Sequence, residues 1–69
     1  MQAPETLREL VVQASHLGFR SVFVSKPPMD ARLYSGFPSG LYYEDAAGRI
    51  WKAMLDPAKR LLVIALMWW

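Results

Sequence analysis

The last nine residues of the chain, Leu61 to Trp69, are all apolar. A strand of an antiparallel sheet with one face in water alternates apolar and polar residues, and this stretch does not alternate. It is about half as long as a membrane-spanning helix, which needs roughly 18 or more residues. We therefore expect a buried strand over residues 60–69. Its side chains are apolar on both faces, so each face has to be covered by other residues. A helical segment is the alternative.

An amphipathic helix is predicted over residues 5–17. Apolar residues recur there at the spacing of one helix face, at Leu7, Leu10, Val11, Ala14 and Leu17. Thr6 and Glu9 have the form of a capping box, in which the Thr6 hydroxyl accepts from the Glu9 amide and the Glu9 carboxylate reaches back to the Thr6 amide. Gly18 is expected to end the helix.

Further strands follow the helix. They are predicted at residues 19–25, 41–44 and 49–55, before the final strand at 60–69. Two consecutive prolines, Pro27 and Pro28, end the first of them, and Gly48 supplies the hairpin turn between the next two. The expected fold class is α+β, with one helix packed on a small, mostly antiparallel sheet in the order α-β-loop-β-β-β. We expect a single domain over residues 1–69.

A long connection, Lys26 to Ser39, is predicted to be a loop because its fourteen residues include three prolines and one glycine. Connections of this length in a small domain are usually functional or disordered. We therefore expect this loop to form the functional surface. The alternative is that it folds over the second face of the final strand.

The final strand is also expected to mediate self-association, because one helix can cover only one face of the sheet. Exposed apolar patches of this size are typical of interaction surfaces. The expected self-association residues are Leu62, Ile64, Leu66, Trp68 and Trp69. If the helix covers the other face of the strand, the exposed residues are instead Leu61, Val63, Ala65, Met67 and Trp69. A homodimer would support a chain this short, which buries only about 60% of its unfolded surface.

Composition excludes several kinds of chemistry. The chain has no cysteine and one histidine, so disulfides, thiolate chemistry and a closed zinc site are excluded. We expect no metal and no cofactor. The start of the chain lacks the basic and apolar segments of a secretory signal, so a cytoplasmic location without membrane contact is expected.

No catalytic residues are predicted. His16 is the one side chain that ordinarily titrates near neutral pH, and its place near the helix end favours a surface position. Glu44 and Asp45 are adjacent on a strand end and point to opposite sides, so they do not form an acid–base pair. The glycine spacing fits neither a phosphate-binding loop nor a dinucleotide fingerprint.

Arginine and aromatic residues gather in and beside the long connection. Such residues dominate binding hot spots, and the expected partner-binding residues are Arg32, Tyr34, Phe37, Tyr42 and Tyr43. The predicted function is a non-enzymatic protein-interaction module, a regulator or inhibitor that occupies a partner's surface.

Two other functions remain open. A nucleic-acid-binding module is the first, although the net charge of +2 comes from scattered residues rather than a basic stripe. A small nuclease or toxin-like enzyme is the second, with its site among His16, Arg32, Tyr34 and Tyr42.

Overall fold

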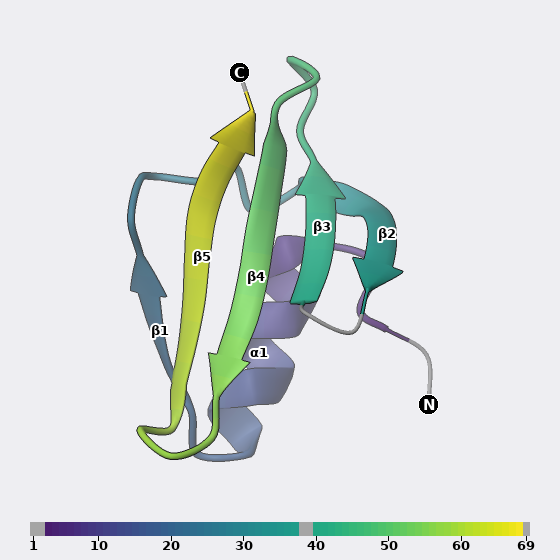
Figure 1. The fold of residues 1–69 in the computed structure, drawn as a ribbon. Helices are drawn as coiled ribbons and strands as arrows, with labels where there is room; N and C mark the ends of the chain where they lie inside the picture. The colour runs from purple at the N-terminus through teal and green to yellow at the C-terminus, as the bar shows by residue number, and fades with distance from the viewer. Residues whose placement is uncertain (1–2, 38–39, 69) are drawn as a thin grey trace.

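The computed structural model describes residues 3–37 and 40–68 and contains one helix and a five-stranded sheet (Figure 1). The elements are α1 (Leu7–His16), β1 (Arg20–Phe23), β2 (Arg32–Phe37), β3 (Gly40–Glu44), β4 (Ile50–Asp56) and β5 (Leu61–Trp68). The predicted α+β fold class is confirmed. The final segment is a strand, which excludes the helical alternative.

The strands lie in the order β1-β5-β4-β3-β2. Strands β2 to β5 form an antiparallel meander, and β1 pairs in parallel with β5 at one edge. The chain therefore has to cross from β1 at one edge to β2 at the other before the meander begins.

The prediction of a continuous loop from Lys26 to Ser39 is wrong, because strand β2 lies within it. Arg32 pairs with Glu44 on β3, and the Leu33 amide donates to the Glu5 carbonyl at 2.8 Å. A bulge at Tyr34 interrupts the alternation by which a strand is recognised in sequence. Pro38 and Ser39 lie outside the described residues.

The N-terminal end of α1 follows the predicted capping pattern with one difference. The Glu9 amide donates to the Thr6 hydroxyl at 3.2 Å. The Glu9 carboxylate accepts from the amide of Glu5 at 3.0 Å, rather than from that of Thr6. Thr6 itself forms a β-bridge with Arg32, so the helix start is joined to the edge strand β2.

Gly18 ends the helix as predicted, in the left-handed region with φ +87°. The Phe19 amide donates to the Ala14 carbonyl at 2.9 Å, and the Gly18 amide donates to the Ser15 carbonyl at 3.0 Å. These two bonds form a Schellman motif. The motif turns the chain directly from α1 into β1.

The core lies between α1 and one face of the sheet. Its buried residues are Leu7, Leu10, Ala14, Ala31, Tyr43, Trp51, Ala53, Leu62 and Ile64. Figure 1 views the sheet from the other side, with α1 behind it.

The connection from β1 to β2 passes on the same side as α1 (Figure 1). There the Leu7 amide donates to the Ala31 carbonyl and the Arg8 amide to the Met29 carbonyl. The alternative that this segment covers the second sheet face is therefore wrong for its described part. Within residues 3–37 and 40–68, no element covers that face, which we call the open face.

No helix in the described part of the chain is both long enough and apolar enough to span a membrane.

Candidate functional site

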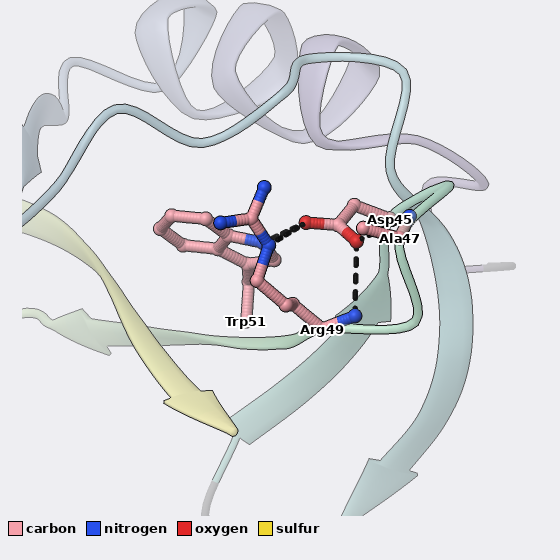
Figure 2. A network of polar contacts seen from close by, with 4 residues as sticks. All are labelled: Asp45, Ala47, Arg49 and Trp51. Carbon is pink, nitrogen blue, oxygen red and sulfur yellow. Dashed lines mark hydrogen bonds and ion pairs between the residues drawn. The ribbon is translucent and has the colours of Figure 1, made fainter. Parts of the chain in front are cut away.

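The carboxylate of Asp45, in the hairpin between β3 and β4, accepts four hydrogen bonds (Figure 2). One oxygen accepts from the backbone amides of Ala47 and Arg49, both at 2.9 Å. The other accepts from the indole nitrogen of Trp51 at 2.9 Å and from Nε of Arg49 at 3.2 Å. Gly48, with φ +81°, closes the turn. Four donors therefore hold a carboxylate whose side chain is almost completely buried.

The pKa of the Asp45 carboxylate is lowered in the folded protein, so the group is ionised at neutral pH. Burial acts to raise its pKa, but the hydrogen bonds from Trp51, Arg49 and Ala47 and the charge of Arg49 outweigh burial and lower the pKa below its ordinary value. A general acid or base must exchange protons near the working pH and reach a substrate. A buried carboxylate with four donors and a lowered pKa stabilises the hairpin instead.

Among the other candidates for catalysis, Arg32, Tyr34 and Glu44 line one pocket beside Asp45, which His16 does not line. His16 is exposed in the last turn of α1, and Glu44 is exposed next to the buried Asp45. Within the described residues, no three His, Asp or Glu side chains lie close enough together to hold a metal ion.

Tyr43, predicted to bind a partner, is instead a core residue with 0% exposure. Its hydroxyl donates to the Pro4 carbonyl at 2.7 Å, which ties the segment before α1 to β3. Tyr43 pairs with the buried Trp51 on β4, and register partners share a face of the sheet, so both side chains face α1. Tyr42 lies on the opposite side of the strand.

Ionisation of Tyr43 should destabilise the fold at high pH. Burial, together with the negative charge of Glu9, raises its pKa from 10.0 to about 12. The stabilisation is complete below pH 10 and is lost as the pH rises through about 12. A shift of this size corresponds to about 3 kcal/mol of unfolding free energy.

Urea unfolding between pH 8 and 12 tests this prediction. The variant Tyr43→Phe should lose stability less steeply above pH 10 than the wild type, because phenylalanine does not ionise. Tyr34→Phe, which changes an exposed tyrosine, should retain the wild-type profile. Parallel profiles for the wild type and Tyr43→Phe would contradict the prediction.

The remaining predicted partner-binding residues lie toward β2. Arg32 and Tyr34 are exposed, Tyr34 by 64%, and both line a pocket of about 480 Å³ beside the Asp45 hairpin. Tyr42 is half-buried on β3, and the Lys52 ammonium lies 5.6 Å from its ring centre. The side chain of Phe37 lies outside the described residues.

Three residues of the set predicted to mediate self-association, Leu62, Ile64 and Leu66, lie on the side of β5 that faces the helix. Leu62 and Ile64 are in the core, 1% and 0% exposed, and Leu66 packs against it. This correction follows from α1 packing on that side of the sheet. The side chain of Trp68 and the whole of Trp69 lie outside the described residues.

The opposite register of β5 forms the centre of the open face. It consists of Leu61, Val63 and Ala65, which are half-buried, and the exposed Met67. Val63 lies between Val22 on β1 and Met54 on β4, which are 40% and 41% exposed. The open face is therefore apolar at its centre, where β1, β5 and β4 meet in the row of Val22, Val63 and Met54.

The sequence shows that β5 is apolar on both sides, but the Asp45 network is not predicted from it. The Asp-Ala-Ala-Gly turn signals the two backbone bonds to Asp45. The hydrogen bond from the Trp51 indole depends on how the hairpin twists against the core, so no local sequence pattern predicts it.

Comparison with protein-family models, with curated proteins and with solved structures finds no match for this chain.

Proposed function

We propose that this chain is a non-enzymatic protein-interaction domain that self-associates through the open face of its sheet. The observation that carries the proposal is the apolar centre of this face, formed by Val22, Met54, Val63 and Met67 from three adjacent strands. Contiguous apolar surface of this kind is typical of protein interfaces. Burying it would stabilise a fold whose own core is small.

We also propose a second surface, for a partner protein, at the edge of the sheet. Arg32 and Tyr34 are exposed on β2, and they combine charge with a large amphipathic ring, as hot-spot residues do. This surface adjoins the open face at Glu44, which pairs with Arg32 and lines the same pocket. A regulator or inhibitor in the cytoplasm fits this arrangement.

A nucleic-acid-binding function is the second candidate, because Lys52 lies over the ring of Tyr42 on the open face. Basic and aromatic residues together can bind phosphates and stack bases. Glu44 and Asp56 share that face with Arg20, Arg32 and Lys52, so its charges nearly balance, which favours protein as the partner. The salt dependence of partner binding discriminates the two functions, because the affinity for phosphates falls steeply as the salt concentration rises.

Replacing Met54 with glutamate is expected to weaken self-association at least tenfold. The substitution places a charge in the apolar centre, which has to be desolvated when the face is covered. Sedimentation velocity between about 1 and 100 μM, where interfaces of modest size associate, measures the effect. A wild-type chain that stays monomeric throughout would contradict the proposal.

Val12→Glu is the matched control. Val12 is an exposed apolar residue of α1, on the other layer of the fold, and it receives the same charge. This variant should associate like the wild type. Equal weakening by both substitutions would indicate a general charge effect rather than an interface at the open face.

A further inference from the structure

We infer that two copies of the chain pack their open faces together about a two-fold axis that sets Arg20 of each copy against Glu44 of the other. This inference rests on the proposed function and specifies its partner and geometry. It follows from the positions of Arg20 and Glu44 at opposite corners of a face on which the register also places Arg32, Lys52 and Asp56.

The register of the sheet places Arg20 and Glu44. Arg20 pairs with Leu61, where β1 and β5 both begin. Glu44 pairs with Ile50, where β3 ends and β4 begins. Because β4 and β5 run antiparallel, these two positions lie at opposite ends of the sheet, three strands apart.

Both residues belong to the open face. Leu61 and Ile50 alternate with the buried Leu62 and Trp51, so they and their register partners point away from α1. Arg20 and Glu44 are exposed, and the structure gives neither an ion pair within residues 3–37 and 40–68.

A two-fold interface must be complementary to itself, because each residue meets the residue that the axis exchanges with it. Opposite charges at two corners of the face satisfy this condition for one placement of the axis. The axis lies in the plane of the face, passes between β4 and β5, and is perpendicular to the line from Arg20 to Glu44. Two reciprocal ion pairs then flank a centre that is apolar except for Lys52, whose aliphatic chain meets Val63 of the other copy because both residues lie on the line from Arg20 to Glu44. That line runs obliquely to the strands, so the strands of the two copies cross at a large angle, as in orthogonally packed sheets.

The size of the face sets the expected affinity. Five strands about 4.8 Å apart, each contributing about 3.3 Å per residue, give a face of roughly 20 by 20 Å. With protruding side chains, two such faces in contact remove roughly 1,000 Å² of accessible surface, near the lower limit for a specific interface. A micromolar dissociation constant is therefore expected.

Two charge reversals test the geometry. Arg20→Glu turns both reciprocal contacts into pairs of glutamates, and Glu44→Arg turns both into pairs of arginines. Each variant alone should associate at least tenfold more weakly than the wild type. An equimolar mixture should recover affinity to within about threefold, because each contact then joins a glutamate of one variant to an arginine of the other. Arg32, which lies across from Glu44 on β2, is unchanged throughout.

The matched control mixes Arg8→Glu with Glu5→Arg, which change exposed charges outside the open face. These variants should associate like the wild type, alone or mixed. Sedimentation velocity measures all the affinities, and circular dichroism confirms that each variant folds.

Each outcome distinguishes the inference from the proposed function. Recovery in the mixture of Arg20→Glu and Glu44→Arg supports the two-fold arrangement. No recovery, with association still lost in Met54→Glu, overturns the arrangement and leaves the open face as the interface. A wild-type chain that is monomeric at about 100 μM, a concentration far above a micromolar dissociation constant, overturns both.

Discussion

Replacing Asp45 with asparagine is expected to lower the free energy of unfolding by about 3 kcal/mol at neutral pH, since hydrogen bonds to charged groups contribute about 1.5–3 kcal/mol each. The asparagine oxygen can still accept from the backbone amides of Ala47 and Arg49. Its amide group cannot accept from the indole of Trp51, so a buried donor loses its partner. Asp45→Ala should be more destabilising because it also removes the two backbone bonds.

The pH dependence identifies the carboxylate as the source of this stability. Because the pKa of Asp45 is lowered in the folded protein, its contribution is complete above the ordinary value of 3.8 and is lost as the pH falls below it. Urea unfolding from pH 7 to pH 2 should therefore show a shallower acid loss in Asp45→Asn than in the wild type.

Asp30→Asn is the control for Asp45→Asn. Asp30 is an exposed carboxylate, and its replacement should change the unfolding free energy by less than about 0.5 kcal/mol, as surface substitutions usually do. Similar losses in the two variants would mean that the buried network does not stabilise the hairpin.

Adjacent residues of β5 should respond to truncation in different ways. Ile64→Ala leaves a cavity in the core beneath α1, where Ile64 is completely buried, and is expected to reduce the unfolding free energy by about 2–5 kcal/mol. Val63→Ala removes two methyl groups from the open face, so its larger effect should be on self-association.

Two measurements separate these effects. Unfolding is measured at a concentration where the chain is monomeric, because association otherwise adds to the apparent stability. Sedimentation velocity then gives the affinity of each variant that folds. A loss of monomer stability in Val63→Ala as large as that in Ile64→Ala would contradict the assignment of the two sides of β5.

The caps of α1, which were predicted correctly, depend on residues that are close together in the sequence. Thr6 and Glu9 are three positions apart, and Gly18 contacts the last turn of the helix it ends. Hydrogen bonds within one turn form wherever the helix forms, so the residues themselves specify them. At Glu5, whose amide donates to Glu9 in place of that of Thr6, the chain also bonds to a partner distant in sequence, because the Glu5 carbonyl accepts from the Leu33 amide on β2.

Strand β2 could not be predicted because its partners are distant and its pattern is irregular. The segment Arg32–Phe37 contains a glycine and a bulge, both of which obscure the two-residue period of a strand. It becomes a strand through pairing with β3 and through contacts with the residues before α1. These contacts exist only once the chain has crossed from one edge of the sheet to the other.

Local residues specify the capping of α1 at Thr6 and Gly18, the hairpin at Gly48 and the apolar residues on both sides of β5. Which side of each strand faces the helix follows from the packing of the whole fold. Alternation specifies that Tyr42 and Tyr43 point in opposite directions, as do Val63 and Ile64, but it does not specify which direction is inward. That choice depends on where α1 packs against the assembled sheet, and it leaves Val63 on the open face and Tyr43 in the core.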